Sequence, residues 1–520
     1  MVESHDMAPQ SEFVGKREWL LTRTKLLQNI STSVHGIRGG DRNSWRDILY
    51  FQSLLAHKKL FYYPQNQFTT YAAFAYRHQP ERLPEYDPKS IGSLYRHIRK
   101  FRTHPKPWSQ EEYLETIDGG ARRTLYAQAL ERLQSGRGVN SRVQPFTKIE
   151  KMGTHKYKAP RMIQARDLTF NIEYGRFIKP LEHKLKSSVH IGKGTAQQIA
   201  SKINKLRCKY KYYTEADHTT FDAHVTVEHL KLTHTFYQAC YYHNKRLRDL
   251  SAKTLRNRCR TRDGIKYTCK GTRMSGDVDT SIGNSLINYA LLKEMLHRLK
   301  IKGEVIVNGD DSIIFSEKPI PIDEAVQIFK TMNMETKIKP SQTNLSKVEF
   351  CRQKYTVNNR GEPSMMTDPN RLVSIFGMTN KQTHSYQEYL RQVLICYISL
   401  SSSNPMYSVW KQLYCDTFGQ ISHKEVKEQL TQLHELPLHF TRHAIRDFVD
   451  EPDTGDFNPT VYAAHGNLDN FVNNVQKLRY KITRIIKLGR ITSEALKYLP
   501  VNLTIQINHD LGTVQLINTN

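Results

Sequence analysis

The sequence has no hydrophobic run long enough to cross a membrane. Its longest apolar run, Val393 to Leu400, stops at three serines, and a membrane-spanning helix needs about 20 residues. The first six residues are polar and lack the basic and apolar parts of a signal peptide. We therefore expect no transmembrane segment and no secretion.

Metal-binding and nucleotide-binding motifs of common types are also missing. The seven cysteines never form Cys-x-x-Cys, which favours reduced thiols in a cytosolic compartment. His434 and His439 are too far apart for a zinc protease motif, and Pro437 interrupts the helix that such a motif needs. The segment 192–195 lacks the first glycine of a phosphate-binding P-loop.

Acidic residues are few compared with basic ones. The 520 residues include 77 Lys and Arg against 50 Asp and Glu, which gives a net charge of +27. Such an excess predicts a polyanionic partner. A hydrophobic content of 38% supports packed cores, and the length suggests several domain-sized parts. A non-catalytic RNA-binding protein would explain this charge equally well.

A basic stretch lies between residues 146 and 166. Lys148, Lys151, Arg161 and Arg166 alternate there with apolar residues at strand-like spacing. Such a pattern can direct cations toward phosphates, although a solvated basic face is the ordinary interpretation of a charge run alone.

Two acidic sites follow predicted strands. Residues 211–216 are rich in aromatics and are predicted to form a strand that ends at Asp217, with Asp222 five positions later. Residues 304–307 and 313–315 predict a hairpin.

The turn of this hairpin is Asn308-Gly309-Asp310-Asp311-Ser312, so two aspartates would lie at its tip. Turns also favour Asn, Gly and Asp for backbone reasons alone, and a purely structural hairpin is the alternative.

A loop of small residues separates the two acidic sites. It contains Ser275, Gly276, Thr280 and Asn284, and an apolar helical pattern follows up to Leu299. Glycine permits close backbone approach to a ligand, and the neutral side chains offer hydrogen bonds. A capped helix start explains the loop but not the acidic sites on either side of it.

Nucleotidyl transfer connects these features. Two divalent ions can activate the attacking 3′-oxygen and stabilise the charge at phosphorus, and hard cations require oxygen ligands. Asp217 and Asp310 are the expected direct ligands. Asp311 is a supporting or alternate ligand, because neighbouring side chains on a strand point to opposite faces.

The motifs resemble those of viral RNA-dependent RNA polymerases. Four motifs stand in the order found in that family: residues 148–166, Asp217-x4-Asp222, Ser275-Gly276-Asp277-x2-Thr280-x3-Asn284 and Gly309-Asp310-Asp311. Their amino-acid sequences are most similar to the tombusvirus-like group of the flavivirus-like supergroup. The resemblance covers about residues 140 to 355.

This resemblance implies an α+β right-hand fold with palm, fingers and thumb and an antiparallel palm sheet. The implied divisions are an N-terminal region with fingertip contacts (1–135), fingers with the basic motif (136–210), a palm strand (211–225), fingers (226–274), the palm with its catalytic hairpin (275–350), and the thumb with a C-terminal tail (351–520).

The resemblance also implies roles for individual residues. Asp217, Asp310 and Asp311 would be catalytic and would hold two Mg2+ ions, with Mn2+ as a substitute. The ribose of the incoming nucleotide would be contacted by Asp222, Ser275, Thr280 and Asn284 beside Gly276. The triphosphate would be held by Lys148, Lys151, Arg161 and Arg166.

Downstream features are less specific. Residues 348–352 resemble the hairpin that grips the primer end, and either Lys337 or Lys339 could be a general acid or a plain surface lysine. Residues 356–520 should be mainly helical, with the clearest helix at 386–400. Alternating apolar residues after 501 predict a hairpin, which could close the thumb or assist initiation without a primer.

The resemblance implies partners as well. These are a single-stranded RNA template, nascent RNA, ribonucleoside triphosphates and, because no membrane helix is encoded, a separate membrane-anchored replication protein. The expected location is the host cytoplasm at membrane-associated replication complexes. A reverse transcriptase is the alternative enzyme, but the carboxylate and Ser/Thr/Asn set near the ribose favours ribonucleotides.

Overall fold

The structure is a computed structural model. It describes residues 82–117, 120–148, 150–153, 160–262, 266–379, 386–422 and 457–487, a terminal hairpin within 503–518, and shorter segments elsewhere. The residues from His434 to His439, considered above for zinc, lie outside the described residues.

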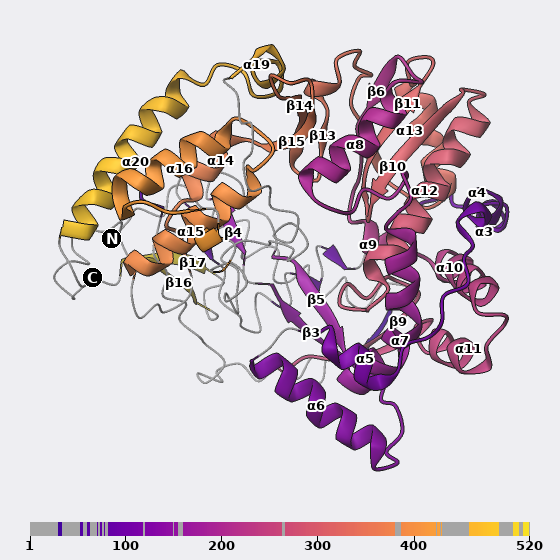
Figure 1. Cartoon of the computed structure of the whole chain (residues 1–520). Helices are drawn as coiled ribbons and strands as arrows, with labels where there is room; N and C mark the ends of the chain where they lie inside the picture. Colours follow the sequence, from indigo (N-terminus) through magenta and orange to yellow (C-terminus); the bar gives the residue numbers. More distant parts are fainter. Residues whose placement is uncertain are drawn as a thin grey trace.

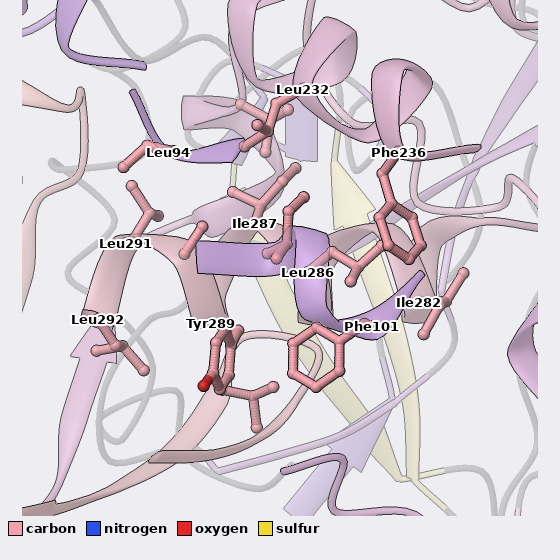
Figure 2. Close-up of a cluster of buried hydrophobic side chains, with 14 of the residues drawn as sticks. Leu94, Phe101, Leu232, Phe236, Ile282, Leu286, Ile287, Tyr289, Leu291 and Leu292 are labelled. Atoms are coloured by element: carbon pink, nitrogen blue, oxygen red, sulfur yellow. The ribbon is translucent and has the colours of Figure 1, made fainter. Parts of the chain in front are cut away.

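A long apolar helix forms the centre of the largest core. Helix α12 (Thr280–Arg298) is buried around almost its whole circumference, which agrees with the helical pattern predicted there. Figure 2 shows Leu286, Ile287 and Leu291 of α12 among side chains from other elements, such as Leu94 and Phe236. Because α12 is fixed on all sides, the polar residues at its N-terminal end have defined positions.

Helices and antiparallel sheets are mixed along the chain, as the predicted α+β class requires. The helices before and around α12 are α3 (Pro88–Gly92), α4 (Tyr95–Ile98), α5 (Gln110–Glu115), α6 (Ala121–Gln134), α7 (Leu168–Leu185), α8 (Ala196–Arg207), α9 (Phe221–His224), α10 (Val227–Cys240), α11 (Lys245–Ala252) and α13 (Ile322–Thr331).

Two small antiparallel sheets carry the acidic motifs. One has the order β10 (Gly303–Asn308), β11 (Asp311–Ser316) and β6 (Tyr212–Thr214), and the other pairs β12 (Thr336–Ile338) with β7 (Ala216–His218). Strand β7 lies beside β11, so both acidic motifs are brought to one region.

A five-stranded sheet carries the basic motif. Its order is β1 (Ile30–Ser33), β9 (Lys266–Lys270), β8 (Arg256–Arg260), β3 (Val143–Thr147) and β5 (Met162–Arg166), and a separate pair joins β2 (Leu60–Tyr62) to β4 (Lys151–Gly153). The buried face packs around Val143, Cys259, Tyr267 and Cys269. The basic stretch therefore contains three strands.

The C-terminal third has its own core. Helices α14 (Pro369–Ile375), α15 (Tyr386–Leu400), α16 (Met406–Phe418) and α20 (Asp469–Lys487) gather on the side of the molecule away from α7 and α12 (Figure 1). Helix α19 (Pro459–His465) contacts a sheet of β13 (Glu349–Phe350), β14 (Gln353–Val357) and β15 (Pro363–Thr367). The bounds of α15 match the predicted packing helix.

One further prediction is confirmed. Strands β16 (Leu503–Asn508) and β17 (Thr513–Asn518) form the predicted terminal hairpin. The seven cysteines are not joined by disulfides in the structure, and their redox state stays a prediction. Within the described part of the chain, no helix combines the length and apolar character required to span a bilayer.

Candidate active site

Asp217 lies inside a strand rather than at the end of one. After Thr214 the chain changes its partner from β11 to β12, so the single strand predicted for residues 211–216 is divided into β6 and β7. That prediction of the strand boundary was wrong because a change of partner strand leaves no signal in local sequence. Asp217 is the central residue of β7 and is exposed.

The predicted hairpin forms with a two-residue turn. Asn308 and Asp311 are register partners, so Gly309 and Asp310 make the turn. Gly309 has a φ of +60°, a left-handed conformation that glycine adopts at little cost. Asp310 is therefore at the tip and Asp311 is the first residue of β11, and both are exposed.

Helix α12 fixes the turn relative to β7. The Ser285 hydroxyl accepts a 2.8 Å hydrogen bond from the Gly309 amide, and the Asn288 amide donates a 3.1 Å bond to the Gly309 carbonyl. Asn288 Oδ1 is 2.9 Å from His218 Nε2, beside Asp217 in β7. Burial lowers the pKa of His218 to about 4, so this ring is neutral at physiological pH and donates to Asn288.

Sequence reasoning missed Ser285, Asn288 and His218. For Ser285 and Asn288, the available signal was the presence of polar side chains within the otherwise apolar α12. These residues connect the two acidic motifs through the buried core, so the positions of Asp217 and Asp310 depend on one another.

The carboxylates of the two motifs repel each other. Surrounding protein atoms desolvate Asp311 and, together with Asp310 and Asp217, raise its pKa to about 6. Desolvation and Asp217 also raise the pKa of Asp310. A concentration of negative charge with accessible oxygens is the donor chemistry that hard divalent cations require.

These acids suit a cation by the type of their donor atoms, and the structure does not show a preformed cage around a metal ion among the described residues. In the described residues, no three His, Cys, Asp or Glu side chains are arranged closely enough to hold a metal ion. The oxygen donors and their mutual repulsion fit Mg2+ or Mn2+, because a divalent cation would relieve the repulsion between these carboxylates.

A second cluster links Asp222 to the loop before α12. Asn284 Nδ2 donates a 2.7 Å hydrogen bond to Asp222, and Arg273 Nε donates a 2.9 Å bond to Asn284 Oδ1. Arg273 also donates to Asp279 at 2.9 Å, and Tyr237 donates to the same carboxylate oxygen at 3.1 Å.

The orientation of Asn284 is thereby fixed. Because Arg273 uses the amide oxygen, the amide nitrogen must face Asp222. Arg273 is only 1% exposed, and a Cβ at Gly283 would collide with its guanidinium. Burial and the Asp310 charge raise the pKa of Asp222 to about 6 despite this hydrogen bond. Sequence reasoning gave Arg273 no role, although it directly precedes the small-residue loop.

The other residues predicted beside the ribose, Ser275, Gly276 and Thr280, are held by contacts to β5 and within their own loop. The Ser275 hydroxyl donates to the Met162 carbonyl and accepts from the Gln164 amide, both at 3.1 Å. Thr280 donates to the Met274 carbonyl at 2.9 Å. A Cβ at Gly276 would lie 2.7 Å from the Gln164 carbonyl oxygen, so glycine is required for this close packing. These contacts position the loop, and the roles predicted for these residues toward a ribose stay predictions.

Arg161, from the basic stretch, lies close enough to Asp310 and Asp222 for their charges to act on it. It forms a two-pronged ion pair with Glu150, which also lies 3.4 Å from Lys148. The Glu150 hydrogen bonds raise the pKa of Arg161, and the charges of Asp310 and Asp222 act in the same direction. Lys151 lies in β4, but its side chain is outside the described residues.

Arg166 does not reach this site. Its guanidinium is buried and forms a bidentate pair with Asp277 at 2.8 and 2.9 Å, with a further 2.7 Å bond to Asn257. Burial alone would lower the pKa of Arg166, but Asp277 reverses the direction and raises it. The structure therefore places this predicted triphosphate ligand in the protein interior, because its partner Asp277 approaches from a loop 111 residues away.

The two candidate general acids differ in their surroundings. Lys337 is the register partner of Asp217, whereas Lys339 Nζ lies 3.1 Å from Glu215. Lys337 is thus the lysine next to the carboxylate site, a distinction that sequence alone left open. The turn between β13 and β14 confirms the short hairpin predicted for residues 348–352.

Comparisons with known proteins agree with the motif pattern. A family model described as viral RNA dependent RNA polymerase matches residues 77–449. The RNA-directed RNA polymerase of tobacco necrosis virus (strain A) is 28% identical over 351 residues, which are 61% of this chain and 48% of that protein. The enzyme of turnip crinkle virus is 31% identical over 302 residues, covering 54% and 38%. The chain spans less than half of the length of these relatives.

Proposed function

Because the chain belongs to the family of viral RNA-dependent RNA polymerases, we propose that it copies an RNA template by joining ribonucleoside triphosphates to an RNA 3′ end. The resemblance inferred from the sequence motifs is confirmed by the family match. The observation that carries the proposal is the shared support of β7 and the β10–β11 turn by α12, which brings Asp217 near Asp310 and Asp311.

Asp217, Asp310 and Asp311 are the proposed metal ligands. Two Mg2+ ions held there, or Mn2+ in their place, would supply Lewis-acid activation of the 3′-oxygen and stabilise charge at phosphorus. The protein contributes a tight hairpin turn and exposed carboxylates to this arrangement. Lys337 is the proposed proton donor to the departing pyrophosphate, since it is the cross-strand neighbour of Asp217.

Asp222 and Asn284 form the proposed ribose selector. A ribose 2′-hydroxyl both donates and accepts hydrogen bonds, and the paired carboxylate and amide offer both complements. This pair favours RNA synthesis over the reverse transcriptase alternative. Ser275 and Gly276 support the selector by holding the loop on β5, and Thr280 supports it by a hydrogen bond to Met274 within the loop.

Arg161 and Lys148 are the proposed triphosphate ligands. Both contact Glu150 in the structure, and a triphosphate could replace that carboxylate because guanidinium groups bind phosphate oxygens in the same forked geometry. Arg166 would act through Asp277, by fixing the loop that precedes α12.

A right-hand arrangement follows from this proposal. The sheets with Asp217 and Asp310 would be the palm, the five-stranded sheet would belong to the fingers, and the helices α14 to α20 would form the thumb. A single-stranded template and nascent RNA would be the partners, together with a membrane-anchored replication protein at host cytoplasmic membranes.

A primer-extension assay tests the proposal. The chain is given an RNA template and primer with Mg2+ or Mn2+, and with either ribo- or deoxyribonucleotides. We expect ribonucleotide incorporation that Asp310→Ala abolishes. Preferred use of deoxyribonucleotides would indicate a reverse transcriptase, and RNA binding without incorporation would indicate a non-catalytic RNA-binding protein.

A further inference from the structure

Five cations lie on the outward face of the hairpin β8–β9. Along β8 the side chains alternate between exposed and buried, and β9 follows a similar pattern. The exposed positions form a group that we call the basic face: Arg256, Arg258, Arg260, Lys266 and Lys270. All five are directed away from the buried side of the sheet, which holds Cys259, Tyr267 and Cys269.

The basic face places like charges directly opposite one another. Arg256 is the register partner of Lys270, and Arg260 is the register partner of Lys266. Cross-strand pairs of like charge destabilise a sheet. The arrangement therefore has an energetic cost in the isolated protein that a bound anion would offset.

Within the part of the chain that the structure describes, no carboxylate is a counterion for this face. Among the described residues, none of these five side chains comes within ion-pair distance of a carboxylate, in contrast to Arg161 and Lys148 with their shared Glu150. The described residues therefore leave the charges on β8 and β9 available to an external partner.

The neighbouring strand adds an aromatic side chain to the same face. Val143 of β3 is the parallel register partner of Cys259, and both are buried in one cluster. Side chains alternate along β3, so Phe146 points to the side occupied by Arg258 and Arg260. Phe146 is 40% exposed, and an exposed aromatic ring can stack on a nucleic-acid base.

We propose that the basic face binds single-stranded RNA through its phosphates, outside the carboxylate site. A row of cations with an aromatic neighbour is the combination that sequence-independent single-strand binding uses. Arginines on β8 suit phosphate oxygens through forked hydrogen bonds. An anionic membrane is disfavoured because membrane-surface binding needs an extended apolar strip, and this face offers only one large exposed apolar side chain, Phe146, among the described residues.

The test compares two triple variants of the full chain in RNA binding. One replaces Arg256, Arg258 and Arg260 by Gln. The matched control removes three exposed lysines at the opposite end of the β10–β11 hairpin from Asp310: Lys300, Lys302 and Lys318. Binding of a labelled oligouridylate of about 20 nucleotides is followed by fluorescence anisotropy over a range of salt concentrations.

The β8 variant should lose about tenfold or more in affinity at low salt. Its log–log salt slope should become shallower by roughly 2, since each single-strand phosphate contact contributes about 0.7. The control should change much less. A third variant with Lys at all three positions should retain most of the slope, which would assign the effect to charge rather than to damaged folding.

Equal losses in the β8 and lysine-end variants, or an unchanged slope in the β8 variant, would overturn the inference. Binding of the same variants to phosphatidylserine vesicles is measured in parallel. If the β8 variant keeps its RNA affinity but loses vesicle binding, the inference is also overturned, and the face is assigned to membranes. This test is independent of the proposed polymerase activity. A wild-type chain that is inactive but whose RNA affinity depends on β8 would refute catalysis and still support this binding site.

Discussion

The Asn284 amide donates a 2.7 Å hydrogen bond to the Asp222 carboxylate across 62 residues of sequence. Arg273 determines which way the amide faces by occupying its oxygen. The pair is therefore a defined donor and acceptor set, held by a buried cation.

Asn284→Ala should weaken the choice of ribonucleotide over deoxyribonucleotide. Loss of a hydrogen bond to a charged group costs about 1.5–3 kcal/mol, so the ratio of kcat/KM values for the two sugars should fall by roughly tenfold or more. The measurement is single-nucleotide incorporation with each triphosphate. Ser281→Ala, one turn away on the same helix, is the control, and an equal fall in both variants would refute the selector.

Arg273→Met should destabilise the protein strongly. Removal of one partner of a buried ion pair leaves the other charge uncompensated and costs about 3–5 kcal/mol. The double variant Arg273→Met/Asp279→Asn should lose less than the sum of the single variants, as measured by thermal unfolding. Arg273→Met/Asp277→Asn is the mismatched control, and additive losses in both doubles would contradict the coupling.

Asp310→Asn should abolish nucleotide incorporation without destabilising the fold. Desolvation and Asp217 raise the pKa of Asp310, so the ionised carboxylate is unfavourable in the metal-free protein. In EDTA we expect a melting temperature equal to that of the wild type or about 1–2 °C higher. Millimolar Mg2+ should raise the melting temperature of the wild type only. A clear loss of stability in EDTA would show that Asp310 has a structural role.

Lys337→Gln should slow catalysis by roughly a hundredfold if Lys337 donates a proton. Lys339→Gln is the matched control, because its ammonium group is occupied by Glu215. Single-turnover incorporation rates should be measured across pH. Recovery of activity in Lys337→His below neutral pH would support the acid role, and equal rates in the two Gln variants would remove it.

Glu294→Gln should lower stability at neutral pH. Burial alone would raise the pKa of Glu294, but hydrogen bonds from His97, Arg96 and Arg298 lower it from 4.5 to about 2. The stabilisation is therefore full above about pH 4.5 and disappears as the pH falls toward 2. We expect a loss of about 2 kcal/mol at pH 7, with the melting curves of the two proteins converging in acid. A difference independent of pH would indicate lost packing instead.

Local patterns in the sequence were sufficient for several elements. Helix α15, helix α12 and the hairpin around Asp310 depend on periodicity and turn chemistry within a few residues, and they form as predicted. The family resemblance depends on ordered motifs and is confirmed for the same reason.

Side-chain partners could not be predicted in the same way. The burial of Arg166 against Asp277 requires two distant segments to meet in space. The local sequence around either residue does not indicate that they form an ion pair. Arg273 was missed because a buried arginine and an exposed one look alike in sequence. The choice between Lys337 and Lys339 depended on the register of β12 with β7.

The tight connection between β10 and β11 limits how this region can vary. Only Gly309 and Asp310 lie between the paired strands. The turn therefore cannot accommodate an added or deleted residue without a change in the pairing of the strands. A change of length by one would rotate every following side chain of β11 to the wrong side of the sheet. Because Gly309 needs a left-handed φ and the register fixes the length of the turn, both the size and the number of residues at this connection are constrained.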